Sequence, residues 1–204
     1  IDFKGIAHTF HSSRAETSVL ATTLLAALFL ELEFSIFLGV LLSLVLYLNR
    51  TSRPTVVALA PSGDERRLNS ATSDTEQCPQ LRIVRVDGSL FFGAVGYVQE
   101  SLRKLKERQP GQQHVLLVAA GINFVDLAGV EMLERETKSL REAGGDLYLC
   151  NIKPGVEESL RLSGMLEYLG EDHLFHTKKE AISAIVSRLN PSNCDTCSTL
   201  SFAE

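Results

Sequence analysis

The sequence predicts an α/β domain, a sandwich of helices packed on a mixed β-sheet, preceded by a hairpin of two apolar helices. Two observations carry this prediction. The stretch from Ser18 to Leu48 contains only two charged residues, Glu31 and Glu33. From Leu81 onward, short apolar segments typical of strands alternate with amphipathic segments typical of helices. The net charge of -5 gives no case for nucleic-acid binding.

The start of the chain indicates that it is a piece of a longer protein. The first residue is Ile1, and the only methionines are Met132 and Met165. Because normal initiation does not produce such an N-terminus, we expect a fragment or a processed product.

Two apolar runs, Ser18–Leu30 and Phe34–Leu48, flank a short break at Glu31-Leu32-Glu33. One helix over both runs would place two carboxylates near the bilayer centre, at about 2.5–3.5 kcal/mol each. A hairpin of two short helices moves them to the far interface. It also places all flanking basic residues on the side that the positive-inside rule assigns to the cytosol, namely Arg14, Arg50 and Arg53. The alternative is a buried helical hairpin of a soluble protein.

The segment that follows is expected to be a connector. Pro54 stops the preceding helix. Val56–Ala60 is compatible with a short strand, whereas Pro61–Asp64 and Asn69–Gln77 have the composition of loops. We therefore expect little of this segment in the folded domain.

The first half of the domain is predicted as two strands, a helix and a strand. Leu81–Val86 is rich in branched residues, and Asp87-Gly88 offers a tight turn into a second strand, Leu90–Ala94. Val95–Arg108 has a helical pattern. Val115–Ala120 is an unbroken apolar run, which is typical of a strand covered on both faces.

The second half continues the alternation of helix and strand. Asp126 is placed to cap a helix that Gly144-Gly145 ends. The next elements are expected to be a strand, a helix with a proline in its first turn and a short strand, at Leu147–Cys150, Pro154–Ser163 and Leu174-Phe175. Thr177 and Glu180 form a capping box before the last helix. The order is therefore β-β-α-β-α-β-α-β-α, a mixed sheet with four helices.

This order, with three local signatures, resembles the STAS domain, the fold shared by bacterial anti-sigma-factor antagonists and the C-terminal tails of SulP anion transporters. The signatures are Val86–Phe92, Gly121–Gly129 and Thr177–Ala181. The apolar N-terminal part is similar to the last two SulP membrane helices, and Ser52–Pro54 is similar to their exit into the linker.

The resemblance implies a division of the chain into four parts. Residues 1–50 are expected to be the last membrane helices of the transporter, and 51–80 the linker. Residues 81–190 are expected to form a STAS-type sandwich, and 191–204 a flexible tail.

The candidate site is the turn Asp126-Leu127-Ala128-Gly129, for which a partner or an anion is the expected ligand. In anti-sigma-factor antagonists the matching turn carries a phosphorylated serine one residue before the glycine. Here that position is Ala128, so the resemblance implies no kinase-driven switch. Free backbone N–H groups at the helix start can hold an anion or a carboxylate of a partner. Alternatively, Asp126 only caps the helix and Gly129 only permits close packing.

Other candidate residues give weaker signals. Cys194 and Cys197 have the spacing of a zinc pair, but a structural zinc site needs four ligands, so we expect reduced thiols. Cys150 is expected in the core. His173 and His176 are expected on the surface, and the adjacent Phe91 and Phe92 are expected in the core.

The resemblance implies the C-terminal part of a secondary inorganic anion transporter of the sulfate or bicarbonate class. Its STAS domain would serve a cytosolic regulatory or dimer-organising role in a multi-pass membrane protein of the inner or plasma membrane. The expected partners are the remaining transporter helices and a second copy, with the anion bound in earlier helices. No nucleophile, phosphate loop or acid–base pair is evident, so neither an enzyme nor a cofactor is expected. The alternative is a membrane-tethered signalling module of the anti-sigma-factor-antagonist type without a phosphorylatable residue.

Overall fold

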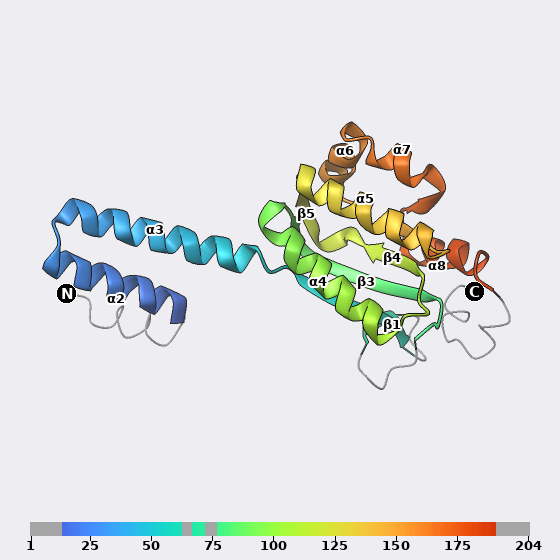
Figure 1. Ribbon diagram of the computed structural model, residues 1–204, viewed down its shortest axis with the longest axis horizontal. Coiled ribbons are helices and arrows are strands. Elements are labelled where there is room, and N and C mark those ends of the chain that lie inside the picture. The colour runs from blue at the N-terminus through green and yellow to red at the C-terminus, as the bar shows by residue number, and fades with distance from the viewer. Residues whose placement is uncertain (1–13, 63–66, 72–76, 191–204) are drawn as a thin grey trace. The chain divides into compact units, whose positions relative to one another are not determined.

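The computed structural model describes residues 14–62, 67–71 and 77–190 (Figure 1). The chain divides into two compact units, Ile1–Thr51 and Ser52–Glu204. The first unit is helical, and the second carries the sheet.

The first unit is a helical hairpin of α2 (Arg14–Phe29) and α3 (Leu32–Thr51). The two helices pack closely, because a side chain at Gly39 of α3 would approach Oγ1 of Thr23 in α2 to 2.7 Å. The expected break is shorter than Glu31-Leu32-Glu33, since α3 already begins at Leu32. Glu33 lies in the first turn of α3, where the helix dipole favours a carboxylate.

One of these helices has the length and composition of a membrane span. The 20 residues of α3 have a mean hydropathy of 1.9 in their most apolar window, and a helix of this length extends over about 30 Å. The apolar part of α2, Thr17–Phe29, is shorter. The helical hairpin is confirmed, whereas its character as two membrane spans is supported only for α3.

The second unit is built on one mixed sheet. Its strands are β1 (Thr55–Ser62), β2 (Arg67–Ser70), β3 (Leu81–Leu90), β4 (His114–Val118), β5 (Ile122–Val125), β6 (Asp146–Cys150) and β7 (Leu174–Phe175). The strand order is β2-β1-β3-β4-β6-β7, with β5 also paired to β3. β1 runs antiparallel to β2 and β3, and the remaining pairs are parallel. The predicted mixed sheet is confirmed.

Helices cover both faces of the sheet (Figure 1). They are α4 (Phe92–Arg108), α5 (Leu127–Glu142), α6 (Pro154–Leu162), α7 (Met165–Leu169) and α8 (Lys178–Val186). The first four pack on one face and α8 packs on the other, each face with its own apolar cluster. Adjacent residues of β3, Ile83 and Val84, belong to opposite clusters, as the alternation of a strand requires. Cys150 is buried in the α8 cluster, so its expected core position is confirmed.

The predicted hairpin at Asp87-Gly88 is wrong. β3 continues through both residues to Leu90, and α4 begins at Phe92 instead of Val95. Gly88 has a φ of +143°, which favours glycine, and a side chain there would approach Cβ of Pro54 to 2.6 Å. Gly88 lies where the pairing partner of β3 changes. β3 pairs with β4 before this point and with β5 from Gly88 onward.

The connector expected before Leu81 contributes two strands to the sheet. β1 pairs with β3 from Thr55 to Leu59, and Leu59 is buried in the α8 cluster. The loop expected over Asn69–Gln77 begins inside β2. The rest of that loop lies largely outside the described residues. We therefore propose that the folded domain begins near Ser52.

The later elements follow the prediction closely. The strand expected at Val115–Ala120 ends at Val118, and a 3-10 turn, η2 (Ala119–Gly121), leads into β5. The cap of α8 is present, since Thr177 accepts a hydrogen bond from the Glu180 backbone N–H at 3.2 Å. The Glu180 carboxylate reaches back to the backbone N–H of His176 at 3.3 Å. The short α7 and the second 3-10 turn, η3 (Glu171–His173), were not expected.

Candidate partner-binding surface at the start of helix α5

Asp126 joins the starts of two helices. Its Oδ1 accepts a hydrogen bond from the backbone N–H of Gly129 at 2.9 Å, which caps α5 as predicted. Its Oδ2 accepts a second one from the backbone N–H of Phe92 at 2.9 Å, in the first turn of α4. The N–H of Asp126 donates to the carbonyl of Leu90 at the end of β3. One carboxylate thus fixes how two helices leave the sheet.

Gly129 is required by a close approach of main chains. A side chain at this position would lie 2.4 Å from the carbonyl oxygen of Leu90 and 3.0 Å from Cγ1 of Val125. Both neighbours belong to strands, so neither can move away easily. The alternative that assigns Asp126 to capping and Gly129 to packing therefore accounts for these two residues.

The other two residues of the turn differ from each other. Leu127 is 69% exposed, whereas Ala128 is partly buried against the core. Two aromatic residues near the turn are exposed as well, Phe92 at 83% and Phe124 at 53%. We call Phe92, Phe124 and Leu127 the apolar rim. Large apolar side chains gathered at one place on a surface favour contact with a partner.

The position of Phe92 corrects the expectation that both phenylalanines lie in the core. Phe91 is half-buried and precedes α4, while Phe92 is the first residue of the helix and faces outward. The expectation depended on a strand at Leu90–Ala94. Since a helix starts there instead, the two side chains meet different surroundings.

The turn offers no hydroxyl group, because Leu127 and Ala128 stand between Asp126 and Gly129. Two backbone N–H groups at the start of α5 are already engaged by Asp126. The N–H of Gly129 bonds the Asp126 side chain and that of Val130 bonds the Asp126 carbonyl. Whether the start of α5 receives an anion or a carboxylate of a partner stays a prediction.

His173 is buried, so the expectation that it lies on the surface is wrong. Its Nδ1 lies 2.9 Å from Oδ1 of Asp172, and its Nε2 lies 3.0 Å from Oδ2 of Asp146. Its ring stacks on Tyr148, with the ring centroids 4.8 Å apart. The 3-10 turn η3 brings this side chain against the sheet, which sequence spacing alone does not indicate. His176 is exposed, as predicted.

The same cluster attaches the end of α8 to the sheet. Arg188 donates to Oδ2 of Asp172 at 2.7 Å, and its guanidinium lies 5.5 Å from the centroid of the Tyr148 ring. Burial raises the pKa of Tyr148 and lowers the pKa of His114, whose Nδ1 is 3.2 Å from the Tyr148 hydroxyl. Every member of the cluster has a partner inside the domain, which favours a structural role.

Neither metal binding nor a reactive thiol at Cys150 has support within the described residues. In residues 14–62, 67–71 and 77–190, no group of three or more histidine, cysteine or acidic side chains could hold a metal ion. Burial raises the pKa of the Cys150 thiol to about 12, which keeps it protonated and unreactive. Cys194 and Cys197 lie outside the described residues, so the weak metal candidate there stays a prediction.

Fold and surface define the class of the domain. A mixed sheet with α8 on one face and α4 to α7 on the other, in which Asp126 and Gly129 set the start of α5, is an α/β sandwich of the STAS type. The chain belongs to the STAS domain family, whose model matches residues 72–181.

Similarity to transporters extends beyond this domain. Sulfate transporter 1.1 of Arabidopsis thaliana is 28% identical over 170 residues, which are 78% of this chain and 26% of the relative. A probable sulfate transporter of Mycobacterium tuberculosis is 26% identical over 178 residues, 86% of this chain and 32% of the relative. The predicted kinship with sulfate transporters of the SulP family is confirmed, and these relatives are transporters rather than enzymes.

A solved structure has the same fold. The murine anion transporter solute carrier 26 family member A9 matches with a TM-score of 0.78 at 20% identity, over 90% of this chain and 30% of that chain. The chain thus spans about a quarter to a third of the length of these proteins.

Proposed function

We propose that this chain is the C-terminal part of a secondary transporter of inorganic anions, of the sulfate or bicarbonate class. Its similarity to sulfate transporters over most of its length supports this proposal. The apolar helix α3 is consistent with it. The anion would bind in helices that precede this chain in the whole protein.

We propose further that the STAS domain lies in the cytoplasm and organises or regulates a dimer of the transporter. The observation that carries this role is the apolar rim. Phe92, Phe124 and Leu127 remain exposed although the domain buries two apolar clusters, so the rim is available to a protein partner. Because Ala128 stands where the related switching turn carries a phosphorylated serine, and Leu127 beside it also lacks a hydroxyl group, the contact would be constitutive rather than controlled by phosphorylation.

The experiment places a charge on the rim of the full-length transporter. Leu127→Glu should weaken the contact, because a carboxylate buried in an apolar interface costs about 2 kcal/mol or more, roughly 30-fold in a dissociation constant. Since the Leu127 side chain is exposed, the fold of the domain should be unaffected. The dimer fraction in mild detergent and the uptake of radiolabelled sulfate are the measurements.

Leu162→Glu is the matched control. Leu162 is also a strongly exposed leucine, but it lies at the end of α6 and does not belong to the apolar rim. It should leave dimer fraction and uptake as in the wild type. Wild-type behaviour of both variants would exclude the rim as the functional contact, and equal loss in both would indicate a general effect of added charge.

A further inference from the structure

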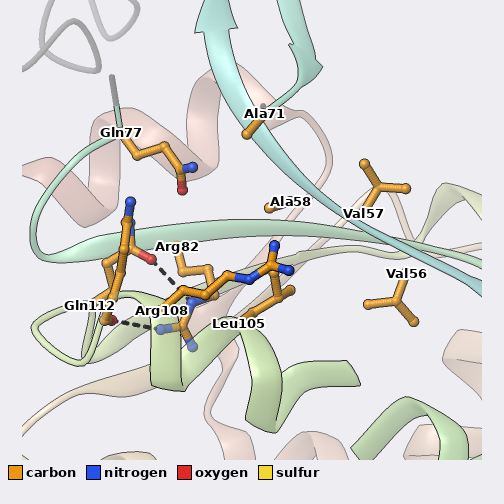
Figure 2. Close-up of a pocket in the computed structure, with 10 residues that line it drawn as sticks. Val56, Val57, Ala58, Ala71, Gln77, Arg82, Leu105, Arg108 and Gln112 are labelled. Carbon is orange, nitrogen blue, oxygen red and sulfur yellow. Dashed lines mark hydrogen bonds between the residues drawn. The ribbon is translucent and has the colours of Figure 1, made fainter. Parts of the chain in front are cut away.

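A pocket of about 560 Å³ lies between β1, the start of β3 and the end of α4 (Figure 2). One part of its wall is apolar and comes from Val56, Val57 and Leu105. The other part is polar and cationic, and comes from glutamines and from Arg82 and Arg108. No acidic residue is among the described residues that line it.

Arg82 is a buried cation at the wall of this pocket. Only 3% of the surface of Arg82 is exposed. Its Nε donates to Oε1 of Gln112 at 3.1 Å, and its Nη2 donates to the carbonyl of Gln109 at 2.9 Å. Gln112 is itself held in place, because its Nε2 donates to the carbonyl of Cys78 at 2.8 Å. The guanidinium is therefore fixed by neutral acceptors, which leaves several of its five N–H donors for another ligand.

The charge of Arg82 is compensated incompletely inside the domain. Within the part of the chain that the structure describes, no carboxylate lies at hydrogen-bonding distance from it. Burial lowers the pKa of Arg82, against an attraction from Glu136 of α5. Burial also raises the pKa of Glu136, so this carboxylate is itself poorly solvated. A buried cation normally requires an anionic partner.

Arg108 supplies a second cation to the same pocket. It is the last residue of α4 and is exposed, and none of the described residues forms an ion pair with it. Figure 2 draws its side chain together with that of Arg82 among the residues that line the pocket. Guanidinium groups bind carboxylate and phosphate oxygens in pairs, which makes them suited to oxyanions.

We propose that this pocket binds a small organic oxyanion, a carboxylate or phosphate group on an apolar body. Arg82 and Arg108 would receive the charged group, and Val56, Val57 and Leu105 would contact the apolar body. The proposal is independent of the transport function, since it depends only on the residues of the STAS domain.

The test uses the full chain in a non-ionic detergent with benzoate and phenyl phosphate as probes. Saturation-transfer NMR from the protein to the aromatic protons of each probe measures binding. Comparison of the probes distinguishes a carboxylate site from a phosphate site, and benzyl alcohol reports contact of the apolar body alone. We expect the charged probes to bind the wild type, and excess inorganic phosphate to displace them.

Arg108→Gln is the decisive variant, because Arg108 is exposed and its loss should not affect folding. It should weaken binding of the charged probes roughly tenfold, as expected for one charged hydrogen-bonding group. Arg135→Gln is the control, since Arg135 is an exposed arginine of α5 that pairs only with Glu131 at the surface. It should bind as the wild type does.

Three outcomes would overturn the proposal. The first is absence of binding of both charged probes to the wild type. In that case the role of Arg82 would be structural, as a donor to the carbonyl group of Gln109 at the end of α4. The second is equal weakening by Arg108→Gln and Arg135→Gln, which would indicate unspecific attraction. The third is binding of benzyl alcohol as strong as that of benzoate.

Discussion

At the scale of single residues, the start of α5 depends on one carboxylate and one missing side chain. Asp126 bonds the N–H groups of Gly129 and Phe92, while Gly129 lets α5 approach the end of β3. The cap that Asp126 provides to the Gly129 N–H is local, because the two residues are three positions apart, and for this reason the sequence indicated it. The contacts of Asp126 with Phe92 and of Gly129 with Leu90 join distant parts of the chain, so the sequence indicated the two residues but not these neighbours.

Gly129→Ala should destabilise the domain by about 1–3 kcal/mol, because the added methyl group has no room beside the Leu90 carbonyl. The measurement is urea unfolding of a fragment that begins at Ser52. Gly96→Ala in α4 is the matched control, since a side chain there meets nothing within 4 Å. It should stabilise by about 0.5–1 kcal/mol. The same sign for both variants would contradict the steric argument.

Other residues of the site could not be predicted, since their surroundings come from distant parts of the chain. The burial of His173 depends on Asp146, 27 positions away, and on the ring of Tyr148. In the sequence, Arg82 is a single charged residue within a predicted strand. Nothing in the neighbouring residues indicates that its guanidinium will donate hydrogen bonds to Gln109 and Gln112. Only the tertiary structure brings such groups together.

At the scale of elements, periodicity predicted the helices and most strands well, while the ends of β3 show its limit. Asp87-Gly88 is a strong turn signal by composition. In the structure, the same glycine allows β3 to exchange β4 for β5 as its neighbour. Both uses require a positive φ, so the dipeptide alone cannot distinguish a reversal from a change of partner.

The role of β1 leads to a prediction on the limits of the domain. A fragment from Ser52 to Glu204 should unfold cooperatively, whereas one from Leu81 to Glu204 should lose about 3 kcal/mol or more, or aggregate. The shorter fragment lacks the pairing of β1 with β3 and the buried side chain of Leu59. Thermal unfolding followed by circular dichroism measures the difference. Equal midpoints for the two fragments would show that β1 is dispensable.

At the scale of the whole molecule, the apolar hairpin leads to a prediction on membrane topology. Single cysteines introduced by Ser13→Cys and Ser52→Cys in a full-length transporter without native cysteines should resist a membrane-impermeant thiol reagent in intact cells. Glu31→Cys, at the turn between α2 and α3, should react. The reason is the basic flanks at Arg14, Arg50 and Arg53, which favour the cytosolic side at both ends.

The same residues become the control once the cells are permeabilised, when all three cysteines should react. Labelling of Ser13→Cys but not of Ser52→Cys in intact cells would mean a single crossing. In that case α3 alone, the helix of spanning length, would cross the membrane.

The order of the strands also limits how copies of this protein can associate. The described sheet ends in β2, with four residues, at one side and in β7, with two residues, at the other. Edges this short give an approaching strand few N–H and C=O groups to pair with, so sheets of neighbouring copies are poorly suited to join end to end. In the proposed transporter, neighbouring copies in the membrane would hold such domains at high local concentration. Short edges would then protect the domains from fibrous aggregation, and any dimer would form through side-chain surfaces.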